Sequence, residues 1–437
     1  MAMYLPAELR LDSLVMVLAG GRGERLYPLT RDRTKAAVPF GGFYRLIDFT
    51  LSNCLHSGLR RICILPQHQY AGLKNHLQLG WGFFRPELGE SLTLLPPERG
   101  SRAGEYRGTA DAVYQNLRTL QCQMPRYTVI LSSDHIYRLD YRRLIECHAA
   151  REAELTIACM GVGMEEAKRF GVLSVDATER VVGFAEKPVS PRALPGRPGL
   201  ALASLGIYVF NTQVLIDALI EDAACPTSSH DFGADILPRL VDTGRRVYAY
   251  DTRQGAAGER FYWRDIGLID AYWEASMDLL EPTPPFDPHD PSWPTHTHFP
   301  FMPPARLLRQ AGSSASIANV LACNGSQVVD AHVQRSILSP GVVVEPGAVV
   351  IDSVLMEGVK VGRGARVERA VVDEHARIPA GSEIGTDLEQ DWQHLFVSPG
   401  GVVVVPRGLG PSPARQSPAR LGPTEFGRAR VAAVGAA

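Results

Sequence analysis

LVMVLAGGRGERLYPLT, residues 14–30, is the stretch that decides the fold, because an apolar run typical of a buried strand ends in a glycine-rich turn. Glycines at the end of a strand let backbone N–H groups close on an oxyanion. Arg25 in the turn and Lys35 shortly after it add the positive charge that a departing polyphosphate needs. The pattern therefore predicts a nucleoside triphosphate site at this turn.

Two other phosphate-binding motifs do not fit this turn. The dinucleotide fingerprint needs a third glycine where Leu26 stands, and no Gly-x-x-x-x-Gly-Lys-Ser/Thr string occurs. What remains, Gly-Gly-x-Gly-x-Arg-Leu-x-Pro-Leu-Thr with a lysine soon after, resembles the signature of sugar-phosphate nucleotidyltransferases. The resemblance implies that Gly20, Gly21 and Gly23 lie against the nucleotide phosphates.

Composition places the chain among ordinary globular enzymes. It has 437 residues, is 45% hydrophobic and 21% charged, and is long enough for two or three domains. A net charge of −2 gives no electrostatic reason to expect nucleic acid or a membrane surface as partner. The seven cysteines are odd in number and lack Cys-x-x-Cys spacing, and no signal peptide or membrane-spanning run is visible. We expect a cytoplasmic protein.

Residues 13–280, after an N-terminal extension over 1–12, alternate short apolar runs with helical patterns. This alternation is typical of βαβ units and predicts an α/β domain with a Rossmann-like, mostly parallel sheet. Ligands bind such sheets at the carboxyl ends of the strands. The glycine turn and Asp134, which follows another apolar run, should therefore share one edge.

The C-terminal third of the chain differs in composition and in the spacing of its apolar residues. Nine prolines between Glu281 and Pro304 predict a linker over 281–312. Beyond it, over 313–405, aliphatic residues recur every six positions, which predicts a left-handed parallel β-helix of hexapeptide repeats. From 406 to 437 the chain is rich in Pro, Gly, Ala and Arg and is predicted to be a disordered tail. The six-residue series, with one slip, is Ile337, Val343, Val349, Leu355, Val361, Val367, then Val372, Ile378 and Ile384.

Two aspartates are candidates for holding a magnesium ion. In-line attack on the α-phosphorus of a nucleoside triphosphate expels pyrophosphate and needs positioning and charge neutralisation more than covalent help. Asp134 follows a strand, and Asp265 is flanked by aromatic residues. Together, downstream of the triphosphate turn, they form a plausible metal pair. Taken alone, Asp134 could equally cap a helix, and a single loop aspartate is usually only solvated.

Several further strings, in order along residues 13–405, resemble the glucose-1-phosphate adenylyltransferases, which activate glucose for bacterial glycogen. They are FGG (40–42), RLIDF (45–49), LSNC (51–54), YRGTADAV (106–113), FGV (170–172), EKP (186–188), SLGIY (204–208), SHDFG (229–233) and YWRDIG (262–267). The resemblance implies that Asp134 and Asp265 hold Mg²⁺. It also implies that Lys35 and Arg25 assist the triphosphate of ATP, with Gly108 nearby.

The resemblance also assigns the sugar side of the site. Lys187 would hold the phosphate of glucose 1-phosphate, Glu186 a sugar hydroxyl, and Gly171 would contribute its backbone. The remaining contacts are assigned to Ser204, Asp231 and Tyr106, the last in a loop that closes over both substrates. From the residues alone, Glu186 and Lys187 could be a surface pair, Ser204 a turn residue and Asp231 a helix cap.

Regulation is where the sequence departs from the family. The resemblance implies small-molecule allosteric effectors and a homotetramer, with Arg33, Arg45 and Gln67 as regulatory residues. In the enteric-type pattern a lysine that receives a sugar bisphosphate stands where this chain has Asp32, which would repel such a ligand. Pro39 replaces a histidine and Glu105 a tryptophan. We therefore expect altered control, with a different activator.

Three other functions stay open at this point. The first is transfer of a uridylyl or thymidylyl group, for which the glycine turn and both aspartates would also serve. The second is a non-catalytic regulatory subunit, although the presence of Lys35, Asp134, Lys187 and Asp265 weighs against it. The third is an acetyltransferase on the β-helix, which the small number of coils disfavours.

Overall fold

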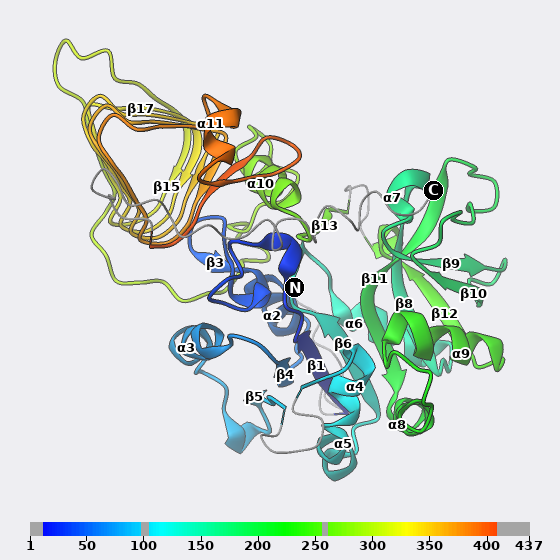
Figure 1. Ribbon diagram of the computed structural model, residues 1–437. Helices are drawn as coiled ribbons and strands as arrows, with labels where there is room; N and C mark the ends of the chain where they lie inside the picture. The colour runs from blue at the N-terminus through cyan, green and yellow to red at the C-terminus, as the bar shows by residue number, and fades with distance from the viewer. Residues whose placement is uncertain (1–11, 98–104, 256–260, 409–437) are drawn as a thin grey trace.

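The computed structural model describes residues 12–97, 105–255 and 261–408. The predicted extension over 1–12 and tail over 406–437 lie, apart from their inner ends, outside these residues. The chain forms an α/β domain and a β-helix that stands beside it (Figure 1).

The α/β domain is built on a nine-stranded mixed sheet. Its central strand β1 (Ser13–Ala19) lies between β4 (Arg61–Pro66) and β6 (Tyr127–Ser132), parallel to both, and β5 (Ser91–Leu94) extends this parallel half. On the other side of β6, β11 (Leu200–Asn211) runs antiparallel. The strands that carry the glycine turn and Asp134 thus lie in the parallel half, as predicted. The remaining strands of the sheet are β8 (Leu155–Gly163), β9 (Gly171–Val175), β10 (Val181–Glu186) and β12 (Val247–Asp251).

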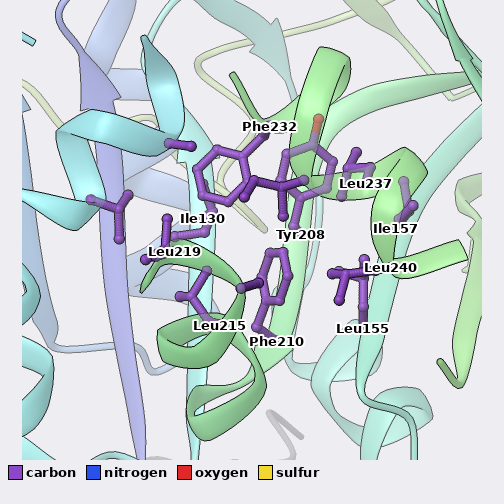
Figure 2. Packing of buried hydrophobic residues seen from close by; sticks show 14 of the residues in the cluster. Ile130, Leu155, Ile157, Tyr208, Phe210, Leu215, Leu219, Phe232, Leu237 and Leu240 are labelled. Atoms are coloured by element: carbon purple, nitrogen blue, oxygen red, sulfur yellow. The ribbon is translucent and has the colours of Figure 1, made fainter. Parts of the chain in front are cut away.

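Both faces of the sheet are covered, which explains the unbroken apolar runs of its strands. Side chains alternate across β1, so that Val15 and Val17 enter one core cluster and Leu14 and Met16 the other. Figure 2 shows part of the second cluster, in which residues of α8 and α9 pack on the sheet. The helices of the domain are α2 (Leu46–His56), α3 (Ala71–Gly80), α4 (Thr109–Tyr114), α5 (Leu117–Gln123), α6 (Tyr141–Ala150), α7 (Met164–Ala167), α8 (Thr212–Ala223), α9 (Leu237–Asp242) and α10 (Ile269–Asp278).

The C-terminal domain is a parallel β-helix, confirming that part of the predicted fold. From His332 to Ile384 its pairing relates residues 17 positions apart, as in Val343 with Lys360 and Val354 with Val371, whereas the coil before it pairs residues 16 apart, as in Gln327 with Val343. The last coil is interrupted by α11 (Leu388–Trp392). The main coil strands are β15 (Ile317–Ala322), β16 (Gln327–Val329), β17 (His332–Leu338), β18 (Val343–Val344), β19 (Val349–Ile351), β20 (Val354–Leu355), β21 (Lys360–Val361), β22 (Arg366–Glu368), β23 (Ala370–Val372), β24 (Arg377–Ile378), β25 (Glu383–Ile384), β26 (Phe396–Val397) and β27 (Val403–Val405).

The strict six-residue series is wrong in its first steps. Val343 and Val349 are half-buried, whereas Val344 and Val350 are fully buried in the axial core. From Val333 onward each coil has one step of five residues, at the corner that contains Arg335, Asp352 or Arg369, each with positive φ. The preceding coil is one residue shorter, with a second step of five at the corner that contains Asp330. The inward ladders, with members 17 residues apart, are Leu338, Leu355 and Val372; Val344, Val361 and Ile378; and Val350, Val367 and Ile384.

The two domains share an apolar interface. Three residues of the β-helix point outward into a cluster that includes Ile266 and Tyr272 of the α/β domain. They are Ile337, Val354 and Val371, and each is next in sequence to a residue that points into the β-helix core. This alternation places one face of the β-helix against α10 (Figure 1). The domains are therefore joined by a buried apolar contact in addition to the chain between them.

The proline-rich segment is packed along α2 rather than loose. Trp293 Nε1 donates to Asn53 Oδ1 at 3.0 Å, and Thr297 Oγ1 donates to Asp48 Oδ2 at 2.6 Å. The predicted end of the linker at 312 is too late, because β14 (Arg306–Leu308) already pairs with β16. Its ladder bonds make it the first strand of the β-helix.

All seven cysteines lie in the described residues and are free thiols. Among the helices of the described ranges, none has the length and apolar character needed to cross a membrane.

Candidate active site

The glycine turn follows β1 and is shaped by close contacts. Gly23 has a φ of 64°, in the left-handed region, and its carbonyl accepts a hydrogen bond from Thr30 Oγ1 at 2.9 Å. A Cβ atom at this glycine would lie 2.9 Å from the Thr30 methyl and 3.2 Å from the Lys35 Cβ. Glycine is therefore needed both for the turn and for the approach of Lys35.

Lys35 and the two predicted aspartates come together at the edge of the sheet. The Lys35 Nζ lies 2.5 Å from Asp134 Oδ2 and 3.6 Å from Asp265 Oδ1. Asp134 stands between β6 and β7 (His135–Tyr137), and β7 pairs antiparallel with β13 (Trp263–Asp265). In that ribbon Asp265 is the partner of His135, which brings it next to Asp134. The expectation that the glycine turn and Asp134 share one edge of the sheet is confirmed, because β1 and β6 are parallel neighbours, and Asp134 caps no helix.

The charge state of Asp134 suits a cation ligand. Its burial favours the neutral acid, but the Lys35 ammonium, with help from His135 and the Ser132 hydroxyl, outweighs that effect. The pKa of the Asp134 carboxyl is therefore held well below its usual range, and the group is ionised at neutral pH.

His135 is a neighbour that the sequence reasoning missed. Its Nε2 lies 3.6 Å from Asp134 Oδ1 and 4.0 Å from Asp265 Oδ1. Among the described residues, Asp134, His135 and Asp265 form the group whose ligand atoms are close enough together to hold an ion, within 4.8 Å of one another. The sequence offered one signal for His135. It directly follows Asp134, a predicted metal ligand, and therefore stays close to it.

This donor set fits magnesium. Two carboxylates from different segments supply hard oxygen ligands, and Mg²⁺ typically completes its octahedron with water and substrate phosphate. The Lys35 ammonium between the carboxylates shows that the arrangement accommodates a cation. Arg25 is close by, since a Cβ on Gly267 would lie 3.5 Å from its Nη2 and 2.9 Å from Asp265 Oδ2.

The predicted sugar-side residues Glu186 and Gly171 face each other across β10 and β9. A Cβ on Gly171 would collide with the Phe184 ring and lie 2.9 Å from Glu186 Oε2, so a side chain does not fit there. Lys187 follows Glu186 with a φ of 43°, and its side chain is 63% exposed. Its Nζ lies 3.0 Å from Glu186 Oε1, so in this state the two form a surface pair.

Ser204 and Asp231 complete the sugar side as local structural anchors. Ser204 Oγ accepts from the Gly206 N–H at 3.3 Å, at a bulge of β11 where Gly206 lies against His135. Asp231 Oδ1 caps the helical turn at 232–236 by accepting from Gly233 N at 2.9 Å. The helix-cap alternative for Asp231 is thus correct, and its role toward a sugar stays a prediction.

Tyr106 does not present its phenol to the cleft. Its hydroxyl donates to the Leu95 carbonyl at 2.6 Å and accepts from Asn116 Nδ2 at 3.0 Å, within the second core cluster. Burial raises the pKa of the phenol to about 12. Gln67 lies against Gly20 and donates to the Tyr106 carbonyl at 3.3 Å. A substrate contact by the Tyr106 side chain therefore needs a different loop position from this one.

The predicted regulatory arginines are engaged with the β-helix. Arg33 pairs with Asp373 at 2.8 Å and with Glu374 at 3.0 Å, and Arg45 pairs with Glu374 at 2.8 Å. Glu374 is buried, yet Arg45 and Arg33 keep its pKa below the usual range. These arginines, whose carboxylate partners sequence reasoning missed, form an ion-pair network between the domains beside a cavity of about 280 Å³.

Comparison with known proteins agrees with both domains. The family model described as nucleotidyl transferase matches residues 14–282, and the one described as GlmU-like, C-terminal hexapeptide matches residues 303–405. Glucose-1-phosphate adenylyltransferase 2 of Vibrio cholerae is 46% identical over 398 residues, covering 90% of this chain and 98% of that protein. The corresponding protein of Vibrio parahaemolyticus is 48% identical with the same coverage. Glucose-1-phosphate adenylyltransferase of Nitrosospira multiformis is 45% identical over 419 residues, covering 93% and 98%.

Proposed function

The chain belongs to the glucose-1-phosphate adenylyltransferases of the nucleotidyl transferase family, and on that premise we propose that it converts ATP and α-D-glucose 1-phosphate to ADP-glucose and diphosphate. The observation that carries the proposal is the cluster of Lys35, Asp134 and Asp265 beside the glycine turn. A non-catalytic subunit performs no reaction that requires a lysine and two aspartates in contact at one place.

In the proposed reaction, a phosphate oxygen of glucose 1-phosphate attacks the α-phosphorus of ATP in line with the departing group. The bond from that phosphorus to the bridging oxygen breaks, and pyrophosphate leaves with its charge. Lys187 would orient the attacking phosphate, while Lys35 and Arg25 would neutralise the leaving side. Asp134 and Asp265 would hold Mg²⁺, which supplies Lewis-acid stabilisation of the phosphates when bound.

Lys35 has two positions in this proposal. Its ammonium pairs with both carboxylates, and when Asp134 and Asp265 hold Mg²⁺ it would turn toward the triphosphate. The flexible stem of lysine permits this change, and Gly23 leaves the stem room beside the turn.

The test is release of pyrophosphate from ATP, UTP, dTTP and GTP, each with glucose 1-phosphate and magnesium, together with identification of the sugar nucleotide formed. ATP should give the highest kcat/KM by a clear margin. Equal use of UTP and ATP would replace the adenylyl assignment with a nucleotidyltransferase of broader or different base preference.

We further propose that the product supplies glucosyl units for glycogen in the cytoplasm, that the enzyme is a homotetramer, and that small-molecule effectors act on it. The free cysteines support a reducing compartment. Asp32 is exposed, precedes Arg33 in the sequence and pairs with Arg31 at 2.9 Å, so this position offers an anionic effector no cation. Titration with fructose 1,6-bisphosphate should give little activation; strong activation would contradict the repulsion assigned to Asp32.

A further inference from the structure

A buried acid–imidazole pair lies outside the group of residues assigned to substrates. Asp222 near the end of α8 and His230 in the following loop have side chains that are only 3% and 8% exposed. Asp222 Oδ2 lies 2.8 Å from His230 Nδ1, and Asp222 Oδ1 accepts from Ser228 Oγ at 2.6 Å. Ser228 Oγ in turn accepts from the His230 N–H at 2.9 Å. The carboxylate thus organises the loop from both of its oxygens.

The pair holds His230 in an unusual backbone conformation. His230 has a φ of 58°, in the left-handed region, which is unfavourable for a residue with a side chain. Such a conformation persists only where surrounding bonds over-determine it. The bonds from Asp222 and Ser228 supply that constraint.

The left-handed backbone conformation of His230 points its carbonyl toward the first turn of α4. This carbonyl accepts from the Ala110 N–H at 2.8 Å and from the Asp111 N–H at 3.3 Å. Gly108 lies so close to the same carbonyl that no Cβ would fit. The adjacent Asp231 Oδ2 accepts from Thr109 Oγ1 at 2.8 Å. The first turn of α4 is therefore held by a loop that is distant in the sequence.

The same loop also reaches the sugar side. Phe232 is anchored in the apolar cluster beside Tyr208 (Figure 2), and a Cβ on Gly233 would lie 2.5 Å from Glu186 Oε2. One short segment, 228–233, thus contacts Gly108 on the ATP side and Glu186 on the sugar side.

From this arrangement we propose that Asp222 and His230 are positioning residues that set the spacing between the ATP side and the glucose 1-phosphate side of the site. They act through the His230 carbonyl and through Asp231, and neither touches the reacting atoms. This inference rests on the proposed function for the assignment of the two sides. A pair that only stabilised the fold would leave the affinity for both substrates unchanged.

The principal test is Asp222→Ala, with steady-state kinetics for both substrates and with melting temperature. Loss of the pair should relax the loop and raise the KM for glucose 1-phosphate about tenfold, the change expected for one buried hydrogen bond of about 1.4 kcal/mol, and should raise the KM for ATP to a smaller extent. Asp222→Asn keeps the size and the bond from Ser228 and can donate to neutral His230, so it should restore KM to within about threefold of wild type.

Asp217→Asn is the matched control, because Asp217 lies on the same helix, is exposed and bonds only to Gln213 within the described residues. It should leave both KM values unchanged. Thr109→Val removes both side-chain bonds between α4 and the loop, the one from Thr109 Oγ1 to Asp231 Oδ2 and the one from the Phe232 N–H to Thr109 Oγ1. Its effect on KM and that of Asp222→Ala should therefore be less than additive in the double variant.

Two results would overturn the proposal: a lowered melting temperature with both KM values within about twofold of wild type, or full additivity with Thr109→Val. If Asp222→Ala does not fold, Ser228→Ala decides, because it removes one bond to the carboxylate and should raise the KM for glucose 1-phosphate about threefold. The KM of each variant is divided by the wild-type KM, measured with the nucleotide that the wild type prefers. If the proposed function is wrong, the wild type will not prefer ATP among the four nucleotides. If this inference is wrong, the KM ratios of the variants will not change as expected.

Discussion

The phosphate side and the sugar side of the candidate site differ in how their assigned residues are held. On the phosphate side, Lys35, Asp134 and Asp265 come from three segments and are already in direct contact. On the sugar side, Lys187 is 63% exposed and pairs with its own neighbour Glu186. Asp231 caps the turn at 232–236 with Oδ1 and accepts from Thr109 Oγ1 with Oδ2. Under the proposed function, the first region is preorganised for charge stabilisation, and in the second the groups assigned to the sugar phosphate would have to exchange their present partners for it.

This difference predicts that substitutions on the phosphate side lower kcat and those on the sugar side raise KM. A preorganised charged group acts in the transition state, whereas a group recruited by the substrate contributes binding in both the ground state and the transition state. The following variants test that division, beginning with the largest expected effect.

Asp134→Asn should lower kcat on the order of 10³-fold, because it removes a metal-ligand carboxylate and the main partner of Lys35. The isosteric amide keeps the packing, so circular dichroism and melting should show a folded protein. Asp32→Asn is the control, because Asp32 is an exposed acid just beyond the turn. It should leave kcat within twofold of wild type, a change of about 0.4 kcal/mol in activation free energy. A mild loss in Asp134→Asn would remove Asp134 from the metal site.

Lys187→Ala should raise the KM for glucose 1-phosphate about 100-fold with kcat within a few fold, as expected for loss of a charge-assisted bond to phosphate. The side chain is exposed, so stability should not change. Lys168→Ala, which removes another exposed lysine paired with a glutamate, is the control. A fall in kcat with unchanged KM would mean that Lys187 belongs functionally to the phosphate side.

Part of the phosphate side was predictable from the sequence because the glycine turn and Asp134 directly follow β1 and β6, and parallel strands place their carboxyl ends along one edge. Lys35 lies farther along, at the start of the short turn Lys35–Ala37, and was predicted from its position after the glycine motif. Asp265 was a candidate because of its aromatic neighbours in the sequence, but its pairing with His135 in the β7–β13 ribbon is a tertiary contact that the sequence does not show. The α/β domain and the β-helix were recognisable for a similar reason, as both repeat a local pattern.

Other features were not predictable because they depend on which segments meet. The partners Asp373 and Glu374 of Arg33 lie in the other domain. The pair of Asp222 and His230 has no motif beyond the SHDFG string. The 17-residue coil differs from three steps of six only through one tight corner, which aliphatic spacing alone does not reveal.

Ser204→Ala tests the boundary between the phosphate side and the sugar side and should have a moderate effect on the KM for glucose 1-phosphate. Its hydroxyl holds the Gly206 N–H at the bulge beside His135, and in the proposed site it also faces the sugar. We expect the KM for glucose 1-phosphate to rise about fivefold, the equivalent of about 1 kcal/mol for one neutral hydrogen bond. Ser174→Ala, on the neighbouring strand β9, is the control, and an equal effect there would mean that the change is not specific to the bulge.

Tyr106→Phe should have the smallest effect and tests whether Tyr106 belongs to the sugar side. The hydroxyl is bonded to the Leu95 carbonyl and Asn116 inside the core, so its loss should lower the free energy of unfolding by about 1 kcal/mol. Both KM values should stay within about twofold, because in this arrangement the ring and its backbone carbonyl, which Gln67 contacts, remain in place. A tenfold or larger rise in the KM for glucose 1-phosphate, with unchanged stability, would show that the loop moves on binding and delivers the phenol to the sugar. The sugar side would then be assembled by loop closure as well as by Lys187, and the contrast with the preformed phosphate side would be larger than the ligand-free structure displays.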